Sequence, residues 1–478
     1  MNSLLKTMAH LTGPFFFTLI LLLPIDLEVN QQRFLAIFTL VVCNWLLTKY
    51  PLYVSGFIGV GLSVLMGVTT AKAAFIPFSS SIIFLFLGGF LFAKSMNENN
   101  LDKRISLYLL SRNFLKGSFK RIIIALLGLT AFFSMWVSNT ATTAMMLPIT
   151  LGILSSLKIK DRKITTVVLL GIAYSASIGG LATPIGSIPN IVSVGLLAET
   201  ANIHISFIEW ILFGLPIVII FLAILITYIF KKMPSNIQKF DNSFILKELK
   251  SLSKLTVNEK FILVFFLLTI FFWFFPSLCK VSLGADHEVT KYVLSRFNSG
   301  IVAIFFSSFL FIFPLGSDQK ILKQSDIKDI DWASLLLFGT GLSLGKVLFD
   351  TGLANIIGNG ILDIFSGSGT FILLSVLIFF TIFSTEVASN TATSNILIPI
   401  VIAMSISINE PPAIFTIAIA LSCSLAFMLP VATPPNAIVY GSEKVEMSEM
   451  MSLGFKLNLI FGAVLSIIFY LASLYLYP

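Results

Sequence analysis

Apolar stretches follow one another from Leu11 to the C-terminus, separated by short polar or basic segments. A helix of about 20 apolar residues crosses the hydrocarbon core of a bilayer. We therefore expect an all-α polytopic membrane protein. Two of the stretches, residues 122–157 and 371–408, are too long for one crossing and carry small polar residues near their centre. We expect each of these two to form a re-entrant helical hairpin, which enters the membrane and returns to the same side.

The polar centres of the two hairpins repeat each other. The sequence SNTAT stands at Ser138–Thr142 and again at Ser389–Thr393, an offset of 251 residues, and Pro148 and Pro399 follow at equal distances. Paired, proline-broken apolar segments in the two halves of a chain are typical of secondary transporters whose site lies between two repeats. The duplication therefore predicts two structural repeats that share one site.

A second pair of polar segments follows the first pair. GSIPN at residues 186–190 corresponds to ATPPN at residues 432–436, and each interrupts a further apolar stretch. Because proline breaks the helical ladder, we expect one broken transmembrane helix in each repeat. The first repeat is predicted at residues 1–230, with scaffold helices over about 10–98, the hairpin over 122–157 and the broken helix over about 164–198. The second is predicted at residues 260–478, with scaffold helices over about 260–349, the hairpin over 371–408 and the broken helix over about 411–441, and residues 231–259 are the linker.

The distribution of charge predicts how the repeats are oriented. Basic residues mark the cytoplasmic side of a membrane protein. They cluster at both ends of the first hairpin, in residues 94–121 and 158–163, whereas no Lys or Arg lies between Lys346 and Lys444 around the second. The first hairpin is thus predicted to enter from the cytoplasm and the second from outside, which makes the repeats inverted. Counting crossings places the N-terminus and the linker in the cytoplasm and the C-terminus outside, and the expected location is a bacterial inner (plasma) membrane.

The composition agrees with a membrane location and argues against other classes of protein. Hydrophobic residues make up 56% of the chain and charged residues 11%, against about 25% charged residues in soluble domains. The net charge of +8 is explained by cytoplasmic loops, and no basic cluster is interleaved with aromatic residues, so we expect no nucleic-acid partner. The three cysteines and three histidines lack metal-ligand spacing, and we find no nucleophile elbow or phosphate loop, so we expect no enzyme activity.

The helix breaks carry the candidate chemistry. Carbonyl groups freed at the prolines can coordinate a hard cation, and a helix that begins at Ser138 or Ser389 presents free N–H groups to an anion. Two such turns that meet from opposite faces would form a pocket for a small dianion. Small polar residues also join helices in membranes, but duplication at one offset argues against that interpretation for both motifs. Glu386, just before the second motif, is either functional or structurally paired, and both interpretations stay open.

With these motifs the chain resembles the divalent anion/sodium symporter family, which comprises solute carrier family 13 and its bacterial dicarboxylate relatives. The resemblance covers nearly the full length and rests on the two SNT motifs and on the segments ATPIGSIPN and PVATPPNAIVYG. It implies a homodimer in which a scaffold holds a mobile transport domain that works by an elevator movement. It also implies Na+ as the co-transported ion and a small dianion as the substrate.

The same resemblance assigns the site residues. The first sodium site would be Ser134, Ser138, Asn139 and Gly186, and the second would be Thr385, Ala388, Asn390 and Ala432. Substrate contacts would come from Ser138, Asn139, Thr140, Ser187, Asn390, Thr391 and Thr433. The two sodium sites obey the chain's own repeat, since Ser134 and Thr385 are 251 residues apart.

The leading hypothesis is a sodium-coupled symporter that imports C4-dicarboxylates (succinate, malate or fumarate) by an elevator alternating-access mechanism. A dicarboxylate exchanger and a sulfate or citrate symporter on the same fold are the alternatives. A membrane protein that senses an anion without transporting it is a more remote hypothesis, because a static sensor has no need of two symmetric gates.

Overall fold

The structure is a computed structural model that describes residues 3–157, 159, 161–233, 243–252, 254–315, 320–365 and 367–475. These residues form α-helices and short 3-10 helices and no strand, which confirms the prediction of an all-α protein. Lys158 and Lys160, which entered the charge argument, and the linker residues 234–242 lie outside the described residues.

Within the described ranges, seven helices are long and apolar enough to cross a membrane, and the number is eight if a bent helix pair is counted as one span. The seven are α5 (Ser81–Glu98), α11 (Phe207–Lys232), α13 (Val257–Leu283), α16 (Trp332–Asp350), α18 (Thr370–Val387), α19 (Asn390–Ser407) and α22 (Met447–Tyr475). The bent pair is α14 (Glu288–Arg296) with α15 (Ser299–Ser308) and η4 (Phe309–Phe311), at 61°. Apolar side chains are exposed on these helices, as on α11 and α13, where Ile219 is 60% and Leu267 59% exposed. Such a surface needs lipid around it, so the chain is an integral membrane protein.

The remaining elements fill the chain between these spans. Those before the linker are α1 (Ser3–Leu22), α2 (Val29–Leu47), α3 (Leu52–Leu65), α4 (Ala71–Phe75), η1 (Ile76–Ser79), α6 (Leu101–Leu110), η2 (Asn113–Leu115), α7 (Phe119–Ser134), α8 (Asn139–Ser156), α9 (Arg162–Gly179), η3 (Pro184–Gly186) and α10 (Ile188–Ala201). The linker contributes α12 (Ser243–Ser251), and η5 (Gln324–Asp329), α17 (Leu353–Ile364), α20 (Pro412–Cys423) and α21 (Pro434–Tyr440) follow it.

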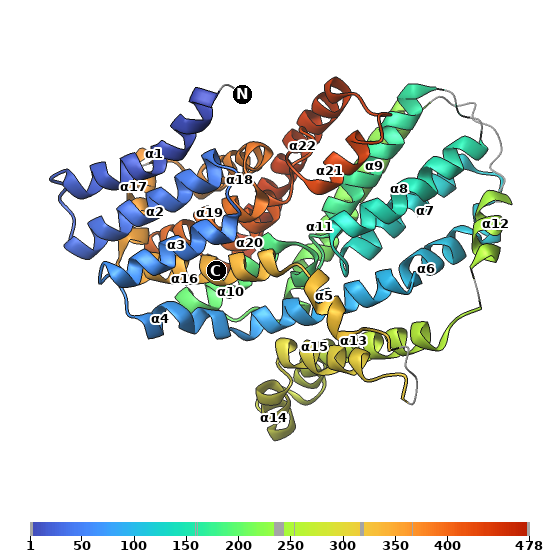
Figure 1. Cartoon of the computed structure of the whole chain (residues 1–478), viewed down its shortest axis with the longest axis horizontal. Helices are drawn as coiled ribbons and strands as arrows, with labels where there is room; N and C mark the ends of the chain where they lie inside the picture. The colour runs from blue at the N-terminus through green and yellow to red at the C-terminus, as the bar shows by residue number, and fades with distance from the viewer. Residues whose placement is uncertain are drawn as a thin grey trace.

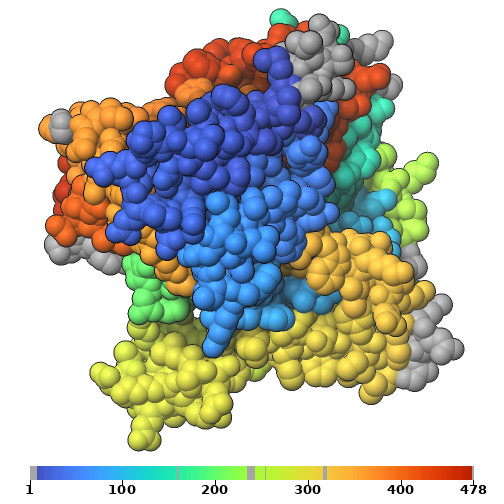
Figure 2. Space-filling view, turned by 60° about the vertical axis from the view of Figure 1, so that its left-hand side comes forward, coloured from blue at the N-terminus to red at the C-terminus, as the bar shows by residue number. Residues whose placement is uncertain are grey.

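The helices gather in groups that are distant in sequence. α1–α3 lie with α16 and α17 at one end of the molecule, and α7 and α8 lie side by side at the other (Figure 1). The helices α13–α15 (yellow) project from one edge, below the early helices drawn in blue (Figure 2). Their contact with the rest includes the packing of α15 along α5. The turns of the two hairpins and the breaks of the two broken helices line one cavity.

The helix boundaries repeat at the offset of the sequence motifs. α8 and α19, which follow the two SNT serines, have the same length, so both their starts and their ends are separated by the offset of the SNT motifs. α5 and α16, and likewise α7 and α18, begin at this same offset, whereas the starts of α10 and α21 are separated by a slightly shorter one. The duplication in the sequence is therefore a duplication of helices, and the inverted orientation of the two sets stays a prediction.

Helices approach most closely where a glycine faces backbone. A Cβ at Gly88 on α5 would meet the backbone of Ala303 on α15 at 2.7 Å. A Cβ at Gly179 on α9 would overlap the backbone of Ala131 on α7. Neither position accepts a side chain unless a helix moves. The second contact holds the first hairpin against the first broken helix, so it positions the turns between them.

Replacing Gly179 by alanine is expected to destabilise the protein by about 1–3 kcal/mol, the usual cost of overpacking a tight contact. Thermal unfolding of the purified protein in detergent measures the effect as a lowered midpoint. Gly128→Ala on α7 is the matched control, because nothing lies within 4 Å of a Cβ added there, and alanine favours a helix over glycine by about 0.5–1 kcal/mol. Equal midpoints for the two variants would contradict the close contact of α7 and α9.

Candidate binding site at the helix breaks

Each hairpin turns through a capped helix start. The Oγ of Ser138 accepts a hydrogen bond from the N–H of Ala141 at 3.2 Å, and the Oγ of Ser389 accepts one from the N–H of Ala392 at 3.4 Å. The two serines are the N-caps of α8 and α19, as the sequence predicted. A cap satisfies one of the four free N–H groups at a helix start, so others remain for a ligand.

Oxygen atoms converge on the side chain of Asn139, the first residue of α8. Its Oδ1 lies 2.6 Å from the hydroxyl oxygen of Ser134. The same terminal atom lies 3.2 Å from the carbonyl oxygen of Ala176 and 3.3 Å from that of Gly186. If the Asn139 amide is rotated, its nitrogen donates hydrogen bonds to these oxygens. If it is not rotated, a cation bound among the oxygens would compensate their negative partial charges. We call Ser134, Asn139, Ala176 and Gly186 the first oxygen cage.

Glycines make the first oxygen cage compact. A Cβ at Gly180 would meet the Asn139 Oδ1 at 2.6 Å and the carbonyl oxygen of Gly186 at 2.8 Å. A Cβ at Gly186 would in turn meet the carbonyl oxygen of Gly180 at 2.5 Å. Any side chain at either position would therefore push apart the groups that converge on Asn139.

A similar arrangement surrounds Asn390, the first residue of α19. The Oγ1 of Thr385 lies 2.7 Å from the Asn390 Oδ1 and 2.9 Å from the carbonyl oxygen of Cys423. One hydroxyl proton serves only one of these acceptors, so at least one pair of oxygens faces each other without a proton. We call Thr385, Asn390 and Cys423 the second oxygen cage. Ala388, which follows α18, is extended at φ −105° and ψ 160° and leads into the same turn.

A cavity of about 490 Å³ lies between the two turns and the two broken helices. Every substrate contact predicted from the sequence lines it: Ser138, Asn139, Thr140, Ser187, Asn390, Thr391 and Thr433. Of the predicted sodium ligands, Gly186, Ala388 and Ala432 also line the wall, whereas Ser134 and Thr385 are fully buried behind it. The helix α5 also contributes to the lining, with Phe86, Gly89, Phe90 and Ala93.

The electrostatic character of this cavity comes from dipoles. Asp331 is the single charged side chain among its described lining residues, and its carboxylate caps α16 by accepting hydrogen bonds from the Ser334 N–H, at 3.0 Å, and the Ser334 hydroxyl. The starts of five helices form part of the wall, namely α8 at Asn139, α10 at Ile188, α16 at Ser334, α19 at Asn390 and α21 at Pro434. A helix N-terminus carries a partial positive charge. The cavity therefore offers N–H dipoles and hydroxyls to an anion, with no Lys or Arg in its described wall.

A buried asparagine ties each helix break together. The Asn190 amide on α10 donates to two carbonyl oxygens of the first break, both at 2.8 Å. The Asn436 amide on α21 donates to two carbonyl oxygens of the second break, both at 3.0 Å. The four acceptors are Gly180, Thr183, Ala426 and Leu429. The two asparagines occupy equivalent positions in the first turns of their helices, so one device fixes both breaks.

The structure brings several groups to the site that were not predicted from the sequence. The carbonyl oxygens of Ala176 and Cys423 belong to apolar helix ends, and a backbone group has no side-chain signal. The hydroxyl of Ser424 lies 2.8 Å from that of Ser187, so the two breaks touch each other. Ser424 had a usable signal, since it is a polar residue at the end of an apolar stretch. Trp136, in the first turn, also lines the cavity.

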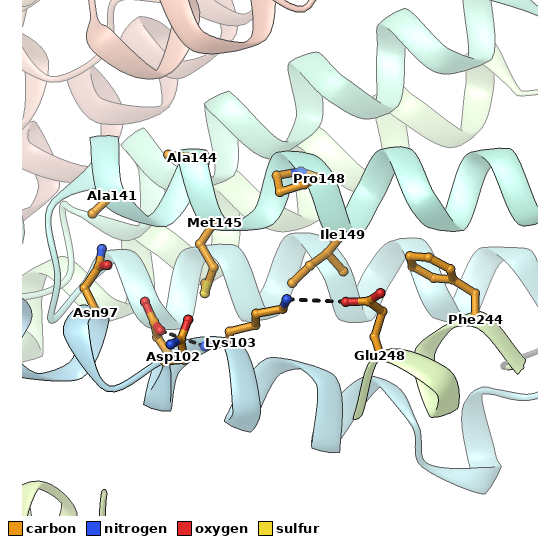
Figure 3. A pocket seen from close by; sticks show the side chains of 11 residues that line it. Asn97, Asp102, Lys103, Ala141, Ala144, Met145, Pro148, Ile149, Phe244 and Glu248 are labelled. Carbon is orange, nitrogen blue, oxygen red and sulfur yellow. Dashed lines mark hydrogen bonds and ion pairs between the residues drawn. The ribbon is translucent and has the colours of Figure 1, made fainter. Parts of the chain in front are cut away.

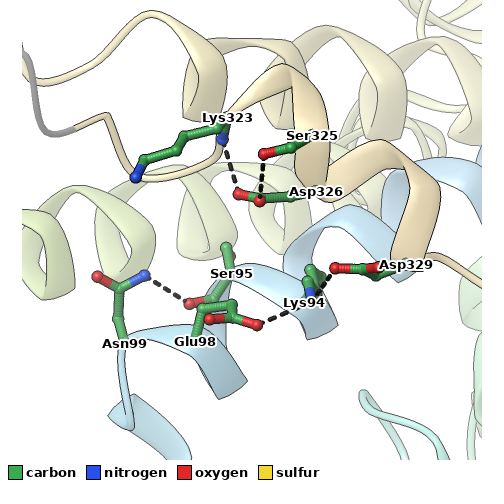
Figure 4. Close-up of polar contacts among 8 residues, drawn as sticks. All are labelled: Lys94, Ser95, Glu98, Asn99, Lys323, Ser325, Asp326 and Asp329. Carbon is green, nitrogen blue, oxygen red and sulfur yellow. Dashed lines mark hydrogen bonds and ion pairs between the residues drawn. The ribbon is translucent and has the colours of Figure 1, made fainter.

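Charged side chains beside the cavity are paired with each other (Figure 4). The Nζ of Lys94 on α5 lies 2.8 Å from the Glu98 carboxylate and 3.0 Å from the Asp329 carboxylate on η5. Ala93 and Asp331, close along the chain to these residues, line the cavity itself. The ion pairs therefore tie the wall helix α5 to the segment that leads into α16, and two carboxylates already neutralise the ammonium group.

A second cavity, of about 450 Å³, lies between α6, α8 and α12 (Figure 3). Lys103 on α6 and Glu248 on α12 form an ion pair of 3.3 Å there, and Phe244 on α12 packs against Gly152 on α8. Burial raises the pKa of the Asp102 carboxyl in its wall. Its described lining includes none of the predicted site residues. This cavity shows how the linker helix joins α6 to the first hairpin.

The helical fold, the lipid-exposed surface and the cavity at paired helix breaks define the class of protein as a membrane transporter. A profile of the family described as "Sodium:sulfate symporter transmembrane region" matches residues 4–477. The chain belongs to this family, which confirms the resemblance recognised in the sequence.

Relatives of similar length agree with this class. An uncharacterized transporter of Haemophilus influenzae is 36% identical over 95% of this chain and 94% of its own. The sodium-dependent dicarboxylate transporter SdcS is 34% identical in Staphylococcus saprophyticus and 32% identical in Staphylococcus aureus, in each case over 96% of this chain and 89% of the relative. These proteins are transporters and not enzymes.

Two solved structures share the fold at low sequence identity. The YdaH transporter of Alcanivorax borkumensis matches with a TM-score of 0.58 and 13% identity, over 98% of this chain and 99% of its own. MtrF of Neisseria gonorrhoeae, described with a class of antimetabolite efflux pumps, matches with a TM-score of 0.58 and 14% identity, over 96% and 98%. At this identity the likeness concerns the fold alone.

Proposed function

We propose that the chain is a sodium-coupled symporter that imports small dianions, foremost C4-dicarboxylates such as succinate, malate and fumarate. The observation that carries the proposal is the cavity at the helix breaks, where two oxygen cages adjoin the starts of α8, α10 and α19 and the described wall has no Lys or Arg. The two SdcS relatives, at 34% and 32% identity, support the same substrate class.

The anion is held by dipoles and hydroxyls. The starts of α8, α10 and α19 direct N–H groups and partial positive charge toward the cavity. Ser187 and the threonines Thr140, Thr391 and Thr433 add hydroxyl donors along the same wall. The volume of about 490 Å³ falls within the roughly 300–1,000 Å³ of small-molecule sites. The cavity therefore has room for a four-carbon dianion.

Sodium supplies the positive charge that the described wall lacks. The first oxygen cage, with Ser138 beside it, and the second oxygen cage, with Ala388 and Ala432 beside it, are the two sodium sites of the proposal. Each centres on an asparagine that also starts a helix facing the anion. Because a buried dianion without cations is costly, sodium and anion favour each other's binding, and that mutual dependence couples their transport.

The alternating movement follows the predicted domain division. We assign hairpins 122–157 and 371–408 and the two broken helices to a mobile transport domain, and the helices at about 10–98 and 260–349 to a scaffold, in two inverted repeats of a homodimer. The division is supported by the lining of the cavity, to which the scaffold helices α5 and α16 contribute together with the turns and breaks. The proposal includes a cytoplasmic N-terminus, a C-terminus outside and a bacterial inner membrane as the location.

Sulfate is the second candidate substrate, because the matching family is described as sodium:sulfate symporters. Sulfate is also a dianion, and the same dipoles and cages would serve it. It is smaller than a C4-dicarboxylate and would span the two turns less completely. Citrate, and dicarboxylate exchange on the same fold, are the remaining alternatives.

Succinate uptake into proteoliposomes is expected to require an inward sodium gradient and to rise under an inside-negative potential. Two sodium ions only neutralise a dianion, so the expected rise requires a third co-ion beyond the two proposed sites, which brings in net positive charge worth about 2.3 kcal/mol per 100 mV. Radiolabelled succinate measures the rate, with choline in place of sodium as the control. Uptake driven by internal dicarboxylate and not by sodium would establish exchange in place of symport. Sodium-driven movement of sulfate without dicarboxylate would overturn the substrate assignment.

Asn139→Ala and Asn390→Ala are each expected to lower sodium-driven uptake by roughly 10- to 100-fold, because each removes an oxygen ligand of a charged ion. The dependence of the rate on sodium concentration should weaken in both variants. Asn30→Ala is the control, since Asn30 is exposed on α2, outside the cavity wall. Normal sodium-driven uptake by either Asn139→Ala or Asn390→Ala would mean that its SNT motif only joins helices.

A further inference from the structure

Glu386 is a buried carboxylate held by amide donors. Its side chain lies near the end of α18 and the residue is 4% exposed. One oxygen accepts from the Phe427 N–H at 2.7 Å and from the Asn458 amide at 2.7 Å. The Met428 N–H lies 2.9 and 3.1 Å from the two oxygens, and the Leu429 N–H lies 3.2 Å from the second. Three successive backbone donors of the second break therefore point at one carboxylate.

The first repeat satisfies the equivalent donors differently. Phe427 and Met428 precede the start of α21 by the same numbers of residues as Leu181 and Ala182 precede the start of α10. The N–H groups of Leu181 and Ala182 donate to the carbonyl oxygens of residues 178 and 179, at 3.1 and 3.0 Å, and so cap the end of α9. Met135 occupies the place of Glu386 at the offset of the SNT motifs. In the second repeat α20 ends earlier and is closed by the N–H groups of Ser424 and Leu425, each 3.1 Å from the carbonyl oxygen three residues before it, so the later N–H groups of the break are left to bond to the carboxylate.

The hydrogen bonds to Glu386 determine which backbone carbonyl oxygens accept no hydrogen bond at the second break. Because the donors turn to Glu386, the carbonyl groups of Ser424 and Leu425 do not receive the bonds that close α9. They directly follow Cys423, whose carbonyl oxygen belongs to the second oxygen cage. The side-chain amide of Asn436 donates to two carbonyl oxygens of the same segment, those of Ala426 and Leu429. The segment is therefore held through its N–H groups by Glu386 and through its carbonyl groups by Asn436, just before it leads to Ala432.

We propose that Glu386 is a positioning residue that makes the two cation sites unequal. It draws the N–H groups of the second break to one side and leaves carbonyl oxygens free beside the second oxygen cage. The second site then binds sodium more tightly than the first. The inference rests on the proposed function, because it concerns the sodium sites named there.

Sodium-dependent thermal stabilisation of the purified protein tests the inference, with choline holding the ionic strength constant. Ligand binding raises the unfolding midpoint according to its concentration over its dissociation constant. Glu386→Gln keeps the shape but turns an amide nitrogen toward N–H donors. We expect it to raise the half-saturating sodium concentration by about tenfold, the scale of losing hydrogen bonds to a charged group. Asn458→Ala removes one of the donors and should shift it in the same direction by roughly two- to threefold.

Combining Glu386→Gln with a second substitution, in either sodium site, distinguishes a positioning role of Glu386 from a purely structural role. With the first site weakened by Asn139→Ala, Glu386→Gln should still raise the half-saturating concentration about tenfold. With the second site weakened by Asn390→Ala, it should add no shift. Glu410→Gln is the matched control, since Glu410 accepts from the Thr370 hydroxyl at 2.7 Å at the far end of the same hairpin.

The possible results distinguish this inference from the proposed function. A Glu386→Gln protein with a lower midpoint at every sodium concentration and an unchanged half-saturating concentration would overturn the positioning role and leave the symporter intact. If Glu386→Gln does not fold, an unshifted Asn458→Ala titration would overturn it equally. A wild-type protein that choline stabilises as well as sodium does would overturn the proposed function, and this inference with it.

Discussion

The structure depends on how backbone groups are satisfied where a helix breaks inside the bilayer. An unpaired amide in hydrocarbon costs several kcal/mol, so irregular backbone survives there only when protein groups meet its needs. In this chain Asn190 and Asn436 meet the carbonyl groups of the two breaks, and Glu386 meets the N–H groups of the second. The carbonyl oxygens left over face the starts of α8 and α19. The need to satisfy backbone groups at the helix breaks thus brings oxygen ligands and N–H donors together at one place.

That concentration explains how an anion and a cation can share a site. The described cavity wall includes the starts of α8, α10 and α19 and a single carboxylate, which is engaged in capping α16. Dipoles alone compensate poorly for a buried dianion, whereas cations held in the adjoining cages compensate well. Asn139 and Asn390 stand at the junction, since each contributes an oxygen to a cage and begins a helix that faces the cavity. Binding of the ion and binding of the substrate can then be coupled directly through these two residues, with no intervening chain of residues between the two sites.

Repetition in the sequence predicted more of this site than composition did. The SNT motifs located both helix starts to the residue, because a serine N-cap is a local signal that tertiary contacts seldom override. All seven predicted substrate contacts came to line one cavity, because the duplication demanded that the two turns meet. Their roles in binding stay predictions.

Other features depend on contacts that leave no local trace. Cys423 contributes a backbone oxygen, which any residue could supply. Ser187 and Ser424 meet across 237 residues, and Glu386 meets Asn458 across 72, on a helix outside the repeated motifs. The sequence raised Glu386 as a buried carboxylate but could not say what surrounds it. The packing of α12 between α6 and α8 likewise depends on the linker's path and not on its composition.

The central claim is that the two oxygen cages hold sodium, and equilibrium binding of radioactive sodium to the purified protein tests it most directly. The account predicts saturable binding of at least two sodium ions per chain, with one ion fewer in Asn139→Ala and one fewer in Asn390→Ala. An unchanged number of bound ions in both variants, or no saturable sodium binding by the wild-type protein, would contradict it.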